Sequence, residues 1–342
     1  MDANKLRRTN VELDRRALEK RFEPKKFFLQ WEVLLALVLA GVLIFNYSVS
    51  GYFVGKQILD ATMNFMDKGF MVLAMIFVIL LGEIDISVAS IVALCSVVMG
   101  ASYNMGVSME ASIAIALVLS AACGLANGLM IAKVRELPSM IITLATMTIF
   151  RGIAYIILKD QAAGGFPSWF QYFGWGYVGI IPFCLVLFII LAVVFGILLH
   201  KTRFGNEIYA MGNSAAVSRY SGIKVNKNKI IIFVLMGLMA GVCAIFLTSR
   251  MASTRPNVAQ GYELDVIAMV VLGGISTAGG KGNMIGAVLA VFIIGYLRYG
   301  LGLINVQSQL MIVIVGILLI GSVLISNLMI NKNAIKKNIF IK

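Results

Sequence analysis

Long hydrophobic runs, separated by short polar stretches, occupy most of this chain. Several runs approach the roughly 20 apolar residues that a helix needs to cross a bilayer, among them 112–132, 183–200 and 230–247. These runs lack the polar stripe at helical period that a core helix of a soluble protein shows. The pattern therefore predicts an all-α, polytopic membrane protein.

The runs predict about ten transmembrane helices, two of them weakly. Four charged residues between Lys56 and Lys68 interrupt segment 49–81, and segment 263–282 is rich in glycine. For both segments a broken or re-entrant helix is the alternative to a full span. The ten predicted spans are 31–48, 60–81, 87–104, 110–132, 138–158, 177–199, 229–249, 263–279, 283–300 and 307–329.

Positive charge is distributed unevenly around these spans. With the N-terminus placed in the cytoplasm, 22 of the 29 Lys and Arg residues fall in cytoplasmic tails and loops, as the positive-inside rule requires. Residues 1–28 lack the order of regions of a signal peptide. We expect a charged cytoplasmic N-terminal extension (1–28), one transmembrane domain (29–330) and a basic cytoplasmic tail (331–342).

Composition excludes several other classes of function. Of 342 residues, 60% are hydrophobic and 13% are charged, and the net charge of +13 acts mainly as the orientation signal described above. The aromatic residues lie in the spans rather than among the basic residues, so no nucleic-acid partner is expected. The four cysteines lie inside apolar runs without a CxxC pair, which indicates packing residues rather than a metal site.

Two carboxylates, Glu83 and Asp85, lie between apolar runs in ILLGEIDISVAS (79–90), and few other carboxylates interrupt the hydrophobic segments. A charge at the bilayer centre costs about 2.5–3.5 kcal/mol on insertion scales, so it usually faces a partner or a polar cavity. Either these carboxylates are solvated in a short cytoplasmic loop, or the chain breaks within the membrane. Gly82 as a tight turn and Ser87 as a helix N-cap favour a structured break.

Arg151, in the apolar segment 143–158, is a second candidate for a polar pathway. The alternative is an arginine whose side chain extends to the outer membrane interface. The residues predicted for a translocation pathway or its motifs are Glu83, Asp85, Ser87, Ser90, Thr146 and Arg151.

Glycines mark expected close contacts between helices. Gly124-xxx-Gly128 and Gly237-xxx-Gly241 would let helix backbones approach each other closely. The segment VLGGISTAGGKGNMIGAVLA (271–290) fails the Walker A pattern at two positions, so any ATP hydrolysis must come from another polypeptide. Its glycines favour a tight reversal between the eighth and ninth spans, at Gly273, Gly274, Gly279, Gly280 and Gly282.

A short helix is predicted within the basic segment 200–229, between the sixth and seventh spans. Asn213 would cap its first turn and Gly222 would end it in a left-handed conformation, so residues 214–221 form about two turns. So short a helix is marginal alone and must dock, either on the chain's own span ends or on another protein. The docking residues share one side, with Arg219 at its edge: Ala216, Val217 and Tyr220.

Four motifs in this order resemble those of the ribose-type permease family, the membrane subunits of bacterial sugar-importing ABC transporters. They are GEIDISVAS (82–90), TLATMTIFRGIAY (143–155), GNEIYAMGNSAAVSRYSGIKV (205–225) and VLGGISTAGGKGNMIGAVLA (271–290). The resemblance extends from about residue 52 to residue 329.

The resemblance implies a multi-pass permease of the bacterial plasma membrane, with neither enzymatic activity nor a cofactor of its own. It would pair with a second permease copy or paralogue, and work with a cytoplasmic ABC ATPase and an extracytoplasmic sugar-binding protein. The helix at 214–221 would be the coupling helix, seated in a groove of the ATPase. The substrates of the family include ribose and other pentoses, rhamnose-like deoxyhexoses, galactose and autoinducer-2, and nucleoside permeases are related.

The chain departs from the family pattern at three positions, which leaves the sugar open. Glu83 replaces a glycine, Ala89 replaces a second glycine, and Ala216 stands where an acidic residue is common. An ion-coupled secondary transporter, with Glu83 and Asp85 as coupling carboxylates, is the competing class of protein. An intramembrane enzyme would need a paired His/Glu metal motif or an activated serine, and the sequence has neither.

Overall fold

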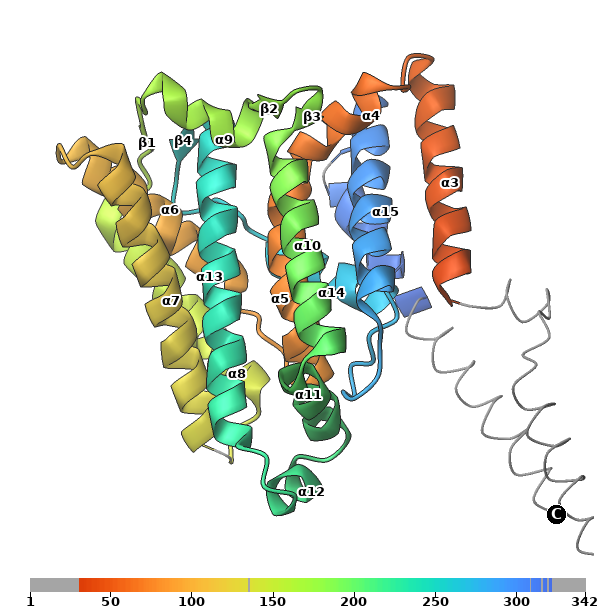
Figure 1. The fold of residues 1–342 in the computed structure, drawn as a ribbon. Helices are drawn as coiled ribbons and strands as arrows, with labels where there is room; N and C mark the ends of the chain where they lie inside the picture. Colours follow the sequence, from red (N-terminus) through yellow and green to blue (C-terminus); the bar gives the residue numbers. More distant parts are fainter. Residues whose placement is uncertain (1–30, 135, 308, 315, 319, 322–342) are drawn as a thin grey trace, which may run out of the picture.

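The computed structural model describes residues 31–134, 136–307, 309–314, 316–318 and 320–321. Its long helices run side by side between two ends of a single bundle (Figure 1). The predicted N-terminal extension and basic tail lie outside the described residues, as does part of the predicted tenth span.

Within the described residues, six helices are long and apolar enough to cross a membrane, or seven if one bent pair is counted as a span. The prediction of a helical, polytopic membrane protein is therefore confirmed, whereas the number of ten spans is not. The six helices are α3 (Trp31–Ser50), α7 (Met109–Lys133), α8 (Ser139–Leu158), α10 (Phe183–Lys201), α13 (Val225–Met251) and α15 (Met284–Leu303).

The bent pair confirms that the segment before residue 81 is broken. Its first part is α4 (Lys56–Ala61) with the 3-10 turn η1 (Thr62–Asn64), and its second part is α5 (Met66–Leu80). The axes of the two parts differ by 67°. Every residue of α5 is buried, because its apolar side chains cover all sides of the helix. This helix is therefore the centre of the bundle.

The glycine-rich segment is also broken, so the prediction of a full span over 263–279 is wrong. Helix α14 (Tyr262–Leu272) has 11 residues, about 16 Å at 1.5 Å per residue, roughly half the hydrocarbon thickness. Irregular backbone follows up to the start of α15. The predicted third span corresponds to α6 (Val88–Asn104), which is also short.

The small residues that the sequence marks lie where two long helices cross. An added Cβ at Gly124 of α7 would lie 2.3 Å from the carbonyl oxygen of Phe233 in α13. An added Cβ at Gly237 of α13 would lie 2.3 Å from the carbonyl oxygen of Ser120 in α7. The predicted close approach is confirmed, since no larger side chain fits at either position.

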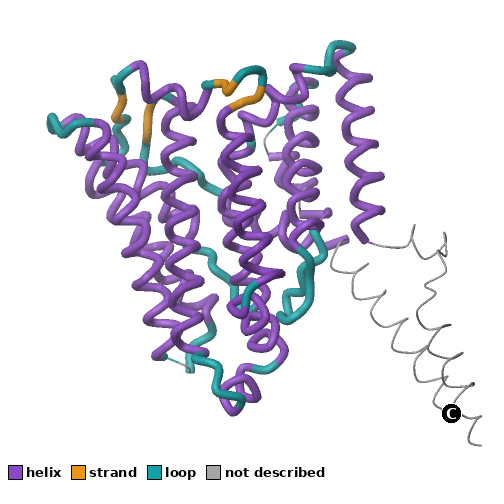
Figure 2. Tube along the Cα trace, viewed as in Figure 1, coloured by secondary structure: helices purple, strands orange, loops and turns teal. Residues whose placement is uncertain are grey.

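The two ends of the bundle differ in structure (Figures 1 and 2). At one end, here the strand end, lie two short antiparallel pairs, β1 (Ala163–Gly164) with β4 (Ser253–Thr254) and β2 (Tyr177–Val178) with β3 (Ile181–Pro182). The turn η2 (Ser168–Gln171) and α9 (Tyr172–Trp175) lie beside them. At the opposite end, here the α12 end, lie α11 (Arg203–Asn213) and α12 (Ala215–Tyr220). The predicted sixth span began too early, because the β2–β3 hairpin occupies its first residues.

Candidate functional site

The chain turns sharply after α5 in a hydrogen-bonded cap. Gly82 adopts φ 74°, its N–H donates to the carbonyl of Ile79 (2.9 Å), and the N–H of Glu83 donates to the carbonyl of Val78 (3.2 Å). These two bonds are those of a Schellman motif, in which a left-handed glycine ends the helix. The predicted tight turn at Gly82 is confirmed.

Asp85 lies inside the protein with only 1% of its surface exposed, so a solvated loop is the wrong interpretation for this carboxylate. Its Oδ1 accepts from the N–H of Ser87 (2.9 Å) and from the Ser87 hydroxyl (2.6 Å). The Asn127 amide of α7 donates to the same hydroxyl (2.7 Å). Ser87 occupies the N-cap position of α6, but the prediction that its side chain caps the helix is wrong, because the hydroxyl is engaged by Asp85.

Side chains of α8 satisfy the extended backbone of the break. The N–H of Ile84 donates to the Ser139 hydroxyl (3.2 Å), and the N–H of Ile86 donates to the Thr143 hydroxyl (3.3 Å). Irregular backbone within a membrane requires such partners, because lipid offers none. The break is therefore a built part of the fold.

The remaining motif hydroxyls turn back onto their own helices. Ser90 donates to the carbonyl of Ser87 (2.6 Å) and Thr146 to the carbonyl of Thr143 (3.2 Å), and both side chains are buried. Glu83 has no described side-chain hydrogen bond to this group and forms an ion pair with Lys229, in the first turns of α13. The two carboxylates thus have separate surroundings.

Arg151 joins three segments through backbone carbonyls. Its guanidinium donates to Pro256 and Val258 (2.7 Å each), in the loop between β4 and α14, and to Ala89 of α6 (3.3 Å). The alternative, an arginine whose side chain extends to the outer membrane interface, does not fit, because the guanidinium donates to backbone carbonyls inside the bundle. The structure brings Arg151 to the start of α6 but not to Asp85 through any described hydrogen bond.

The second break repeats the geometry of the first. The N–H of Gly274 donates to Val271 (2.9 Å), the N–H of Ile275 donates to Val270 (3.3 Å), and Gly274 adopts φ 87°. Helices α5 and α14 pack against each other and end in the same Schellman motif. The similar segments LLGEI (80–84) and VLGGI (271–275) therefore fold alike.

Three glycine segments meet where α5 and α11 end, and we name this contact of Gly82, Gly212, Gly279 and Gly280 the glycine junction. The N–H of Gly280 donates to the carbonyl of Leu80 (2.8 Å). An added Cβ at Gly279 would lie 2.8 Å from the Gly82 nitrogen and 2.9 Å from the Gly212 carbonyl oxygen. The junction therefore connects α11 to both breaks through backbone contacts.

Further contacts hold the glycine-rich segment at either side of the junction. An added Cβ at Gly273 would lie 2.3 Å from Cα of Ala287, and one at Gly282 would lie 2.6 Å from the Ile275 side chain. The Tyr209 hydroxyl of α11 donates to the Gly282 carbonyl (2.9 Å), and burial raises the pKa of this phenol, which keeps it a donor. The close packing predicted for this reversal is present.

Helix α12 is one residue shorter at each end than predicted, and its cap differs. Ser214, in extended conformation, accepts from the N–H of Val217 (3.3 Å) and is the N-cap. The prediction for Asn213 is wrong, because α11, which the sequence did not predict, runs through this residue and its amide donates to Tyr209 (2.8 Å). Gly222 adopts φ 84°, as expected for the end of the helix.

The side of α12 that carries the predicted docking residues faces outward. Tyr220 is 94% exposed and Val217 is 63% exposed, whereas Ser218 on the opposite side is buried. Ala216 and Arg219 are also exposed. The alternative in which these residues dock on the chain's own span ends is therefore wrong.

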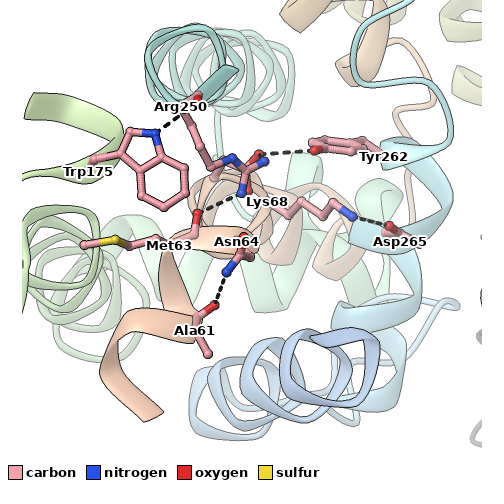
Figure 3. A network of polar contacts seen from close by, with 9 residues as sticks. Ala61, Met63, Asn64, Lys68, Trp175, Arg250, Tyr262 and Asp265 are labelled. Atoms are coloured by element: carbon pink, nitrogen blue, oxygen red, sulfur yellow. Dashed lines mark hydrogen bonds and ion pairs between the residues drawn. The ribbon is translucent and has the colours of Figure 1, made fainter. Parts of the chain in front are cut away.

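A charged network that the sequence did not predict joins α5, α13 and α14 (Figure 3), near the strand end, where α13 ends (Figure 1). Asp67 of α5 binds Arg250 in the last turn of α13 (3.0 Å) and accepts from the Tyr262 hydroxyl (3.2 Å). Arg250 also donates to the Met63 carbonyl (2.7 Å). Asp67 is therefore a further buried carboxylate within the apolar segments.

Next to this pair lies a second group, which we name the triad: Lys68, Asp265 and Arg298. The Lys68 ammonium binds Asp265 (2.7 Å), and Arg298 of α15 forms an ion pair with the same carboxylate. Lys68 Nζ also lies 4.2 Å from the centroid of the Tyr262 ring, within cation–π range. The sequence held a signal for this network. Its three cations, Lys68, Arg250 and Arg298, belong to the few Lys and Arg residues that the predicted topology leaves outside the cytoplasmic tails and loops.

Cavities adjoin the network. One of about 340 Å³ is lined by Lys68, Tyr262, Asp265 and Arg298, among others. A second, of about 350 Å³, is lined by Lys68 and Arg298 with residues of η1 and α15. A third, of about 550 Å³, lies at the β4–α14 loop. Charged side chains and open volume therefore coincide in this half of the bundle.

Comparisons with known proteins identify the family. The model of the family described as branched-chain amino acid transport system/permease component matches residues 57–323. The ribose import permease protein RbsC of Bacillus subtilis is 39% identical over 253 residues, which are 73% of this chain and 78% of that protein. The protein of the same name from Escherichia coli K12 is 33% identical over 303 residues, 87% and 94% of the two chains.

A further relative carries a different substrate in its name. The autoinducer 2 import system permease protein LsrD of Yersinia enterocolitica is 32% identical over 295 residues, 84% of this chain and 89% of that protein. No solved structure matches this chain. Because the family model and these relatives cover most of the sequence, the chain belongs to this family of transport permeases, as a multi-pass membrane subunit of ribose type rather than an enzyme.

Proposed function

We propose that this chain is the permease subunit of an ABC importer and that it conducts a sugar across the membrane. Relatives named as ribose and autoinducer-2 import permeases support a small polyhydroxylated substrate. The pathway would form with a second permease copy or paralogue, and an extracytoplasmic binding protein would deliver the sugar. A separate ATPase subunit would supply the energy.

The exposed side of α12 is the observation that carries this proposal. Tyr220 at 94% exposure and Val217 at 63% present apolar surface on a six-residue helix that is marginal alone. A groove in an ATPase would cover these side chains and stabilise the helix. The helix–groove contact would then be the coupling interface.

The α12 end is cytoplasmic in this proposal. Segment 201–229 carries six Lys and Arg residues, as the positive-inside rule expects for a cytoplasmic loop. The strand end would then face the binding protein, and the charged network would lie in the outer half of the bundle. This orientation places the coupling helix and the sugar's entry at opposite ends.

The glycine junction offers a route by which the ATPase acts on the spans. Ser214 alone separates α12 from α11, and α11 contacts Leu80 and Gly280 through Gly212. Closure of the ATPase around nucleotide would displace α12 and α11. Backbone contact at the junction would pass this displacement to the ends of both broken helices, since there is no side chain between them to absorb it.

Uptake by reconstituted proteoliposomes tests the proposal. The chain is reconstituted with its ATPase and binding protein, and uptake of D-ribose, L-rhamnose, D-galactose, autoinducer-2 and uridine is measured with and without ATP. We expect uptake of one of the sugars that stops when the ATPase is omitted, whatever the ion gradients. Uptake by this chain alone under a proton or sodium gradient would make it a secondary transporter, and uptake of uridine alone would make it a nucleoside permease.

A further inference from the structure

The triad presents more hydrogen-bonding capacity than it uses. Lys68 has three ammonium protons, and one hydrogen bond, to Asp265, is described for them. Nε of Arg298 is buried and has no hydrogen-bond partner among the described residues. Each Asp265 oxygen accepts one bond and retains a free lone pair. Unused donors and acceptors therefore stand side by side.

Structural stability alone does not account for such a group. Three charged side chains within apolar helices require desolvation, and apolar residues of similar volume often give equal or greater stability. In membrane proteins, buried ionisable residues usually mark a pathway or a binding site. Here the charges also adjoin open volume, since Lys68 and Arg298 line both the 340 Å³ and the 350 Å³ cavities.

We infer that the triad is a binding site for a neutral polyhydroxylated solute at the border between these two cavities. A hydroxyl group both donates and accepts, so it can bond Lys68 or Arg298 and Asp265 together. The triad has two cations and one carboxylate, so its net positive charge disfavours a cation, and a fully ionised anion has no donor for the free lone pairs of Asp265. A cavity of about 340 Å³ lies at the lower end of the range for small-molecule sites.

The inference names the substrate-contacting residues of the pathway proposed above and therefore rests on that function. Lys68, Asp265 and Arg298 come from α5, α14 and α15, respectively, so the site forms only when both broken helices are in place. Tyr262 lines the same cavity, beside Lys68. The triad would thus contact a sugar after it leaves the binding protein and before it reaches the α12 end.

Two variants test the site by different means. R298K keeps a cation beside Asp265 but removes the Nε donor. L264W should fill the 340 Å³ cavity from a position that lines it, is 58% exposed and has no side-chain hydrogen bond with the triad. The matched control is I189W, on α10, which is 50% exposed and lines neither cavity. Each complex is assayed in proteoliposomes for initial uptake of radiolabelled D-ribose, L-rhamnose and D-galactose, and for ATPase stimulation by the binding protein.

We expect R298K to lower uptake by about tenfold and to change the ratio between the sugars, as the loss of a hydrogen bond from a charged donor predicts. L264W should lower uptake similarly, while both variants retain folded complex and stimulated ATPase activity, and I189W should match the wild type. If R298K and L264W transport the three sugars at wild-type rates and ratios, the triad is a structural brace only. If the wild-type complex transports no sugar, the proposed function itself fails.

Discussion

Replacing Gly212 with alanine places a methyl group inside the glycine junction. The added Cβ would lie 1.9 Å from the Leu80 carbonyl oxygen and 2.4 Å from the Gly280 nitrogen. Both are backbone atoms, so no side-chain rotation relieves the contact. To reach the 3.4 Å of ordinary van der Waals contact, α11 must move away from Leu80 by about 1.5 Å.

The free-energy change has two opposing parts. Overpacking of a well-packed interior costs about 1–3 kcal/mol, and backbone neighbours favour the upper limit. Alanine within a helix gains up to about 1 kcal/mol over glycine. We therefore expect a net destabilisation of about 2 kcal/mol. The displacement of α11 should reduce coupling more than it reduces stability.

Two measurements on the same protein separate these effects. Thermal unfolding in detergent reports stability, and the number of sugar molecules transported per ATP hydrolysed reports coupling. The matched control is Gly196→Ala in α10, where an added Cβ meets only Met284 Sδ at 3.6 Å. Gly212→Ala should unfold at a lower temperature and transport less sugar per ATP. The control should leave coupling unchanged and unfold at the wild-type temperature or slightly above it, because it gains helix propensity without a clash.

One result would refute the reasoning about the junction. If Gly212→Ala retained the wild-type unfolding temperature and wild-type coupling, the segments would not be in the contact described. A loss of stability with unchanged coupling would keep the packing but remove the junction from the path between α12 and the broken helices.

Three other predictions concern the remaining candidate residues. Asp85→Ala leaves the buried N–H of Ser87 without its acceptor, which should lower the free energy of unfolding by about 1–3 kcal/mol. Glu83→Gly breaks an ion pair that keeps some access to water, with side chains 16% and 19% exposed, so we expect a smaller loss; equal unfolding temperatures and uptake would contradict this order. Val217→Asp or Tyr220→Asp should insert normally but lose ATPase binding in pull-down assays, because an unpaired charge that is fully desolvated in the contact would weaken the free energy of binding by about 3–5 kcal/mol. Retained binding in both variants would exclude α12 as the coupling helix. Arg151→Gln removes charged donors from the carbonyls of the β4–α14 loop and should increase protease cleavage there, and unchanged cleavage would show that the loop is held elsewhere.

The long helices were predictable because their signal is local. A helix that crosses a membrane satisfies its own backbone, so hydrophobic length alone identifies it. The two breaks were also marked locally, by Gly82 and the carboxylates that follow it after α5, and by glycines after α14. The cap of α12 was missed by one residue, because α11 continues to Asn213 and leaves the capping position to Ser214.

The strands and the charged network could not be derived in the same way, because their partners are distant in sequence. Ala163 pairs with Thr254, and Lys68 pairs with a carboxylate 197 residues away. Hydrophobic periodicity reports which residues lie in apolar segments, but not which segments are neighbours. Opposite charges in separate spans were the available signal, because an intramembrane charge needs a partner.

The network and the glycine junction lie at opposite ends of the same two broken helices. Lys68 and Asp265 join α5 to α14 near the start of each helix, and the Gly280–Leu80 bond joins the last residue of α5 to the segment that follows α14. Lys68 and Leu80 are twelve residues apart in α5, about 18 Å at 1.5 Å per residue. Separating the helices at the triad would break a buried ion pair, at about 3–5 kcal/mol. In the proposed function, a displacement that enters at the junction would therefore move α5 and α14 together, and the cavities beside the triad would change shape because this pair moves relative to the surrounding helices.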